Sequence, residues 1–144
     1  MSFTASCSCV IITLVLATLT ITYSEATAVK WTHWHNVHVV NGFSRNDEPL
    51  IVHCKSKNDD LGDHTLWINQ EFRWYFGLNF WFTTLFYCNF KWDSQEKHID
   101  VFNTPDESPL ECMENEECFW KVTEDGFFVS VDNINWVKKL NWHD

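Results

Sequence analysis

The stretch NFWFTTLFYCNFKW, residues 79–92, is the longest run of the chain in which large side chains recur at every second position. One face of such a segment would carry Phe80, Phe82, Thr84, Phe86, Cys88, Phe90 and Trp92. Side chains alternate between the two faces of a strand, so this period of two predicts a half-buried β-strand.

The same period recurs along the chain. It appears in LIVHCKSK (50–57), EFRWYF (71–76), HIDVF (98–102), CFWKVT (118–123) and FFVSV (127–131). With HNVHVVN (35–41) and TLWIN (65–69), the chain has about eight predicted strands.

The connections between these strands are short. NQ at 69–70 and EDG at 124–126 are hairpin signals, and the glycine of the second supplies a positive φ. No segment shows the 3.6-residue period of a crossover helix, which disfavours a parallel sheet. We therefore predict an all-β fold, a two-sheet antiparallel β-sandwich with two disulfides. A closed eight-stranded barrel is the alternative.

The first 28 residues have the pattern of a secretory signal peptide. Residues 9–21 are mostly apolar and uncharged, and ATA at 26–28 offers small residues for cleavage. This apolar run is shorter than the ~20 residues that span a bilayer. A buried N-terminal element is the alternative. We predict a secreted, extracellular protein with a signal peptide at 1–28 and one domain at 29–144.

Cleavage would leave four of the six cysteines: Cys54, Cys88, Cys112 and Cys118. An even number of cysteines in a short secreted chain predicts disulfides, not a metal site. Three pairings are possible. We favour Cys54–Cys118 across the core and Cys88–Cys112, which would fix the acidic segment before Cys118.

The predicted mature chain is strongly acidic. Ten basic residues stand against nineteen acidic ones, a formal charge of −9. Such a surface is repelled by phosphate backbones and anionic headgroups, which disfavours nucleic-acid and membrane partners. We expect a soluble monomer.

The sequence contains no recognisable catalytic motif. It lacks the nucleophile elbow, the metalloprotease motif and a phosphate-binding glycine loop. We predict no enzyme activity, no cofactor and no metal. Two groups of residues are weak metal candidates: the pair His33 and His35, which offers too few ligands, and the carboxylates Asp59, Asp60 and Asp63, which lack the EF-hand spacing.

Two polar segments between the predicted strands are candidates for partner recognition. They are KSKNDDLGDH at 55–64 and the acidic NTPDESPLECMENEE at 103–117. The candidate residues are Lys55, Lys57, Asp59, Asp60, Asp63, Glu114, Glu116 and Glu117. Trp67, Tyr75 and Trp81 would point outward and are candidates for an aromatic platform.

These features together resemble one family, the plant self-incompatibility S-proteins and their homologues. The blocks that carry the resemblance are VHVVNGF (37–43), LIVHCKSKNDDLGDHTL (50–66), FRWYFGLNFWFTTLFYCNF (72–90) and CFWKVTEDGFF (118–128). The resemblance implies a small secreted β-sandwich with two disulfides, and a signalling role that in founding members is the rejection of self pollen.

One position departs from the family pattern. The family tends to carry glycine before TTLF, where this chain has Phe82, and we expect Phe82 to repack an inward strand position.

The sequence leaves three functions to compare. We favour a secreted ligand recognised by a cell-surface receptor. A binding module for a cell-wall glycan or small molecule is the alternative, and an unrecognised hydrolase is the third.

Overall fold

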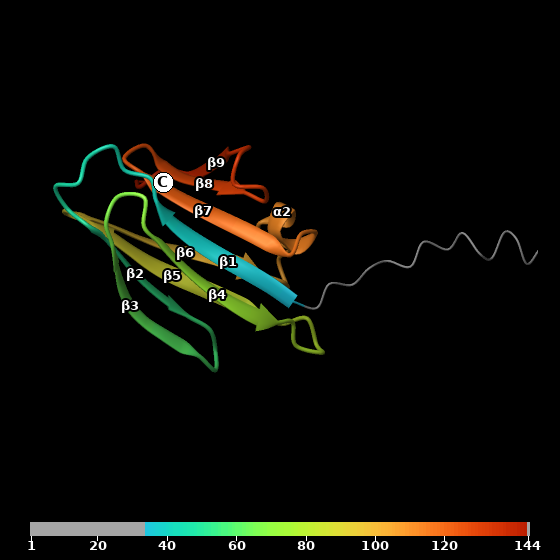
Figure 1. The fold of residues 1–144 in the computed structure, drawn as a ribbon. Helices are drawn as coiled ribbons and strands as arrows, with labels where there is room; N and C mark the ends of the chain where they lie inside the picture. The colour runs from blue at the N-terminus through green and yellow to red at the C-terminus, as the bar shows by residue number, and fades with distance from the viewer. Residues whose placement is uncertain (1–33, 144) are drawn as a thin grey trace, which may run out of the picture. The chain divides into compact units, whose positions relative to one another are not determined.

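The computed structural model describes residues 34–143, which form two β-sheets and a single turn of helix (Figure 1). The five-stranded sheet has the order β4 (Glu71–Gly77), β1 (Trp34–Asn41), β7 (Glu117–Thr123), β8 (Gly126–Ser130) and β9 (Val137–Leu140). The four-stranded sheet has the order β3 (Asp60–Leu66), β2 (Leu50–Lys55), β5 (Leu85–Trp92) and β6 (Gln95–Asn103). The helix α2 (Leu110–Met113) precedes β7.

Two separate sheets confirm the predicted all-β sandwich in place of the barrel. Neighbouring strands are antiparallel with one exception, because β1 and β7 pair in parallel, with Asn36 opposite Glu117. The chain leaves the four-stranded sheet after β6, passes through α2 and enters the five-stranded sheet as β7. β7 therefore runs in the same direction as β1.

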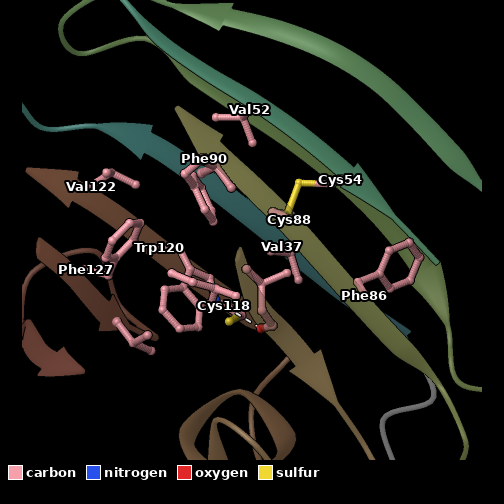
Figure 2. Packing of buried hydrophobic residues seen from close by; sticks show 14 of the residues in the cluster. Val37, Val52, Cys54, Phe86, Cys88, Phe90, Cys118, Trp120, Val122 and Phe127 are labelled. Atoms are coloured by element: carbon pink, nitrogen blue, oxygen red, sulfur yellow. Dashed lines mark hydrogen bonds between the residues drawn. A yellow bond between two sulfur atoms is a disulfide. The ribbon is translucent and has the colours of Figure 1, made fainter. Parts of the chain in front are cut away.

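The inward faces of the two sheets form one apolar core, part of which Figure 2 shows. Val37 of β1, Val52 of β2, Phe90 of β5 and Val122 of β7 are fully buried. Each lies on the face that the period of two predicts. Burying a side chain of this size contributes about 1.5–3 kcal/mol, so the alternating pattern accounts for the stacking of the sheets.

The predicted disulfide pairing is wrong. The bonds are Cys54–Cys88 and Cys112–Cys118, not Cys54–Cys118 and Cys88–Cys112. Cys54 and Cys88 lie directly opposite each other on β2 and β5, with their Cα atoms 4.0 Å apart. Their bond, labelled in Figure 2, therefore lies within one sheet and does not cross the core. The second bond joins α2 to the start of β7.

The strand predicted over residues 79–92 begins only at Leu85. Residues 78–84 form a loop between β4 and β5. Phe82 lies in this loop with a φ of 50°, so the expectation that it fills an inward strand position is wrong. Glycine would adopt this positive φ without strain.

Two strands differ from the sequence interpretation. The second half of the polar run 55–64 is not a loop, because β3 begins at Asp60. β3 is an edge strand with one solvated face, and its His64 ring stacks on Phe72 of β4 at 3.5 Å between centroids. The strand β9 was not predicted, because three of its four residues are exposed and no apolar face marks it.

Only one of the two predicted hairpins is confirmed. The turn at 69–70, in which Asn69 has a φ of 61°, links β3 to β4, which lie in different sheets, so the hairpin predicted there is wrong. β7 connects to its antiparallel neighbour β8 through a turn that ends at Gly126, with a φ of 127°. A Cβ atom at Gly126 would lie 2.2 Å from the carbonyl oxygen of Leu140, so only glycine fits this turn.

The predicted signal peptide at 1–28 and His33 lie outside the described residues. His35 is buried, and its Nδ1 lies 3.0 Å from the carbonyl oxygen of Asn115. Its ring packs on Phe102 of β6 at 4.8 Å between centroids. His35 is therefore a buried residue of β1.

Candidate recognition site

The two predicted recognition segments lie at the same end of the sandwich. Lys55 at the end of β2 pairs with Tyr87 near the start of β5, and Leu85 pairs with Asn103 at the end of β6. In the other sheet, the start of β1 pairs with the end of β4 and with the start of β7.

We call this end the loop end. It comprises the β2–β3 turn (56–59), the β4–β5 loop (78–84), the β6–β7 connection (104–116) and the β8–β9 loop (131–136), as the right and lower parts of Figure 1 show.

The β2–β3 turn is held by its own polar side chains. The hydroxyl of Ser56 accepts a hydrogen bond from the backbone N–H of Asp59 at 3.1 Å, and the N–H of Ser56 bonds the carbonyl oxygen of Asp59 at 2.8 Å. Lys57 and Asn58 between them are exposed, with no side-chain partner among residues 34–143. This turn therefore presents Lys57, Asn58 and Asp59 to solvent from a closed backbone.

Asp60 and Asp63, also predicted for recognition, instead bind His53 of β2. His53 Nε2 lies 2.6 Å from Asp60 Oδ1, and Nδ1 lies 2.6 Å from Asp63 Oδ1. Both ring nitrogens of His53 therefore lie against a carboxylate oxygen of the neighbouring strand. Lys55 adds a contact with Asp60 at 3.2 Å.

The pKa of Asp60 is lowered to about 2. The largest cause is the hydrogen bond that the backbone N–H of Gly62 donates to its carboxylate, and the second is the bond from His53. Gly62 has a φ of 77°, a conformation that glycine adopts without strain and most other residues resist. Asp60 thus fixes the bend at the start of β3.

The acidic residues predicted in the β6–β7 segment also include both solvent-exposed and ion-paired side chains. Glu114 and Glu116 are exposed, with no side-chain partner in the described part of the chain. Glu117 belongs to β7, and its Oε2 lies 2.6 Å from His38 Nε2. The other ring nitrogen of His38 lies 2.9 Å from Glu71 Oε1, so this buried imidazole also bridges two carboxylates.

The eight predicted recognition residues therefore form two groups. Lys57, Asp59, Glu114 and Glu116 extend into solvent at the loop end. Lys55, Asp60, Asp63 and Glu117 make ion pairs that fix strands. Sequence alone could not separate the groups, because it does not show that two histidines lie opposite these carboxylates.

The β4–β5 loop adds aromatic residues that the sequence placed in a strand. Phe80 and Trp81 are 83% and 78% exposed. Trp81 and Tyr75, predicted to point outward, are exposed, as is Trp67 at the opposite end of the sandwich. The signal for the loop was Asn79 four residues before Thr83, since asparagine side chains bond the backbone of nearby residues in turns.

A groove of about 460 Å³ separates the β2–β3 turn from the β4–β5 loop. Its residues include Lys57, Asn58 and Asp59 on one side and Asn79 and Thr83 on the other. A larger groove of about 770 Å³ lies between β6, α2 and β9. The larger groove contains the Lys139–Glu111 ion pair at 2.6 Å, and the hydrogen bond from Lys139 is the main cause that lowers the pKa of Glu111.

Within 34–143, no three His, Cys, Asp or Glu side chains are arranged to hold a metal ion. Both nitrogens of His38 and of His53 lie against carboxylates. No helix in the same range is long and apolar enough to cross a membrane.

Comparison with known families identifies the fold. Residues 36–142 match the model of the family described as plant self-incompatibility protein S1. The chain belongs to this family. The matched range contains both recognition segments, the β4–β5 loop and all four cysteines, so the loop end is built within the family domain.

Curated relatives in the family come from Arabidopsis thaliana. The chain is 42% identical to S-protein homolog 5 over 78 residues, which are 54% of this chain and 58% of the relative. It is 37% identical to S-protein homolog 19 over 91 residues, 63% of this chain and 65% of the relative. The chain thus spans less than two thirds of the length of these relatives.

A solved family structure shares the fold. It is described as a structure of self-incompatibility protein homologues, a widespread family of small, highly stable, secreted proteins from plants. The match has a TM-score of 0.59 at 15% identity and covers 77% of this chain and 96% of the solved chain. At this identity the likeness supports the S-protein fold and says nothing of individual side chains.

Proposed function

We propose that this chain is a secreted plant signalling ligand, recognised by a cell-surface receptor through its loop end. One observation carries the proposal: the solvent-exposed charges of both polar segments, Lys57, Asp59, Glu114 and Glu116, come together at one end of a rigid sandwich. Loops on a stiff scaffold can change without cost to the core, which suits discrimination between partners. Pollen rejection is one process in which such a ligand would act.

Secretion is part of the proposal. The N-terminal segment has the pattern of a signal peptide, and all four cysteines of the described domain are paired in disulfides. Disulfides persist in oxidising, extracellular compartments. Cleavage after Ala28 would be read directly by N-terminal sequencing of the secreted protein, and a mature protein that starts at Met1 would contradict secretion.

The test of receptor recognition is charge reversal at the loop end. The triple variant Asp59→Lys/Glu114→Lys/Glu116→Lys should unfold at nearly the wild-type temperature, because exposed charges contribute about 0–1 kcal/mol each. Its response in a bioassay on the plant's own cells should be abolished or retuned. Full activity of this folded variant would argue against recognition through the loop end.

A further inference from the structure

Several large aromatic side chains are exposed at the loop end. Trp34 at the start of β1 stacks on Tyr75 of the edge strand β4, and β4 leads directly into the loop that carries Phe80 and Trp81. A soluble monomer gains nothing from exposing such rings, and contiguous exposed apolar patches mark interaction sites. Aromatic residues are also enriched among the residues that carry most of the binding energy in protein interfaces.

The loop that displays Phe80 and Trp81 is held in a fixed shape. Asn79 Nδ2 donates to the hydroxyl of Thr83 at 2.8 Å, and the backbone N–H of Thr83 donates to Asn79 Oδ1 at 2.8 Å. The N–H of Asn79 bonds the hydroxyl of Thr84 at 3.1 Å. A loop ordered before binding loses less conformational entropy when its partner arrives.

The same loop contains backbone strain. Phe82 has a φ of 50°, in the left-handed region that side chains with a Cβ disfavour. Strain of this kind persists only where surrounding bonds hold it, and it concentrates at functional sites. The Asn79 bonds hold the strained turn, and the strained turn sets the direction of the two exposed rings.

The two neighbouring segments of the loop end are acidic. The β4–β5 loop itself has no charged residue, whereas the β2–β3 turn and the β6–β7 connection contain six acids and one lysine. The acids are Asp59, Asp106, Glu107, Glu111, Glu114 and Glu116, of which Glu111 pairs with Lys139, and the lysine is Lys57. An apolar centre with a charged rim is the arrangement of a protein–protein interface.

We propose that Phe80 and Trp81 are the apolar anchor of the receptor interface, and that the partner is a protein surface with an apolar socket bordered by lysine and arginine. The inference rests on the proposed function and adds to it the residues that supply affinity. In this arrangement the acidic rim steers the approach of the partner, and the two rings set how long it stays bound.

The ring geometry favours a protein over a glycan. A flat platform for a glycan chain would present coplanar ring faces, but Phe80 and Trp81 meet edge to face at 87°, and Trp34 and Tyr75 stack on each other at 5.1 Å. The acidic rim disfavours an anionic membrane surface. The glycan and lipid occupants are separate arms of the test.

The experiment measures binding of the fluorescently labelled protein to protoplasts from stigma, leaf and root, before and after surface proteolysis. We expect saturable binding that proteolysis abolishes, about 30-fold weaker for Trp81→Ala and for Phe80→Ala, as hot-spot truncations are. Asn79→Ala keeps both rings but frees the loop, and should weaken binding about fivefold. The matched control Trp67→Ala removes an exposed tryptophan from the opposite end and should bind like wild type.

Binding of the wild-type protein and of Trp81→Ala is also measured on immobilised pectin, on xyloglucan and on phosphatidylcholine vesicles. Wild-type binding to any of these that is lost in Trp81→Ala would overturn the protein-partner inference. Trp81→Ala binding that equals wild type, while charge reversal at the rim abolishes it, would overturn the aromatic anchor and leave the proposed function intact. If wild-type protein shows no protease-sensitive binding to any protoplast, both the aromatic anchor and the proposed receptor recognition would be contradicted.

Discussion

Aromatic residues at the two ends of the sandwich include rings in opposite surroundings. At the end away from the loop end, which we call the closed end, Phe43 stacks on Trp92 at 4.4 Å and Phe127 packs on Trp142 at 4.7 Å. Phe43, Phe127 and Trp142 are buried there. At the loop end, Trp81 and Phe80 are held in solvent by a hydrogen-bonded loop. Aromatic content alone therefore does not distinguish core from surface. The local backbone conformation determines whether an aromatic side chain is buried or exposed.

A matched pair of tryptophan substitutions gives the largest difference between the ends. Trp142→Ala removes a buried ring and the hydrogen bond from its Nε1 to the carbonyl oxygen of Thr123 at 2.9 Å. Substitutions of this kind cost about 3–5 kcal/mol of unfolding free energy. Trp81→Ala should cost less than ~0.5 kcal/mol, as exposed substitutions do. Urea denaturation of both variants measures this, and equal losses would show that the β4–β5 loop is part of the core.

The disulfides should differ in the same direction. Cys54 and Cys88 are 34 residues apart, whereas Cys112 and Cys118 at the loop end are 6 apart. Loop-closure entropy then predicts a loss of roughly 4 kcal/mol for Cys54→Ser/Cys88→Ser and of roughly 2 kcal/mol for Cys112→Ser/Cys118→Ser. Chemical denaturation of the two double variants compares them. A larger loss for Cys112→Ser/Cys118→Ser would mean that the Cys112–Cys118 disulfide stabilises more of the domain than the short loop it closes.

Much of the fold follows from the period of two, and the reason is physical. A half-buried strand must alternate, so β1, β2, β4, β7 and β8 could be located from the sequence. Alternation fixes the face of a residue but not its neighbour strand. The facing of Cys54 and Cys88 depends on the register of β2 against β5, which no local pattern contains. The parallel pairing of β1 and β7 was hidden for the same reason.

The candidate site was only half predictable. That polar segments between strands would be exposed follows from composition, and Asp59, Glu114 and Glu116 are exposed. That Asp60 and Glu117 would bind histidines depends on strands far apart in the sequence. The sequence did not predict the aromatic loop, because residues 79–84 continue the alternation of β5. The side-chain hydrogen bonds of Asn79, which stabilise the loop, are not visible in that pattern.

The smallest expected effect is the pH dependence of the Asp60 contacts. The pKa of Asp60 is lowered from 3.8 to about 2 in the folded chain, so its contribution is present above pH ~4 and is lost as pH falls toward 2. Asp60→Asn removes this contribution. The stability of the variant should therefore fall less steeply than that of wild type between pH 4 and pH 2 in urea titrations. Parallel curves would show that Asp60 does not fix the β2–β3 bend.

The most direct measurement of the central claim compares charge reversal at the two ends at constant net charge. One variant is Asp59→Lys/Glu114→Lys/Glu116→Lys at the loop end. The other is Asp47→Lys/Glu48→Lys/Asp125→Lys at the closed end, where all three side chains are exposed. Their affinities are measured as saturation binding to the protoplasts that bind the wild-type protein. Recognition through the loop end predicts at least a tenfold loss for the first variant and wild-type affinity for the second, with both equally stable. Equal losses in the two variants, or a loss confined to the closed end, would contradict it.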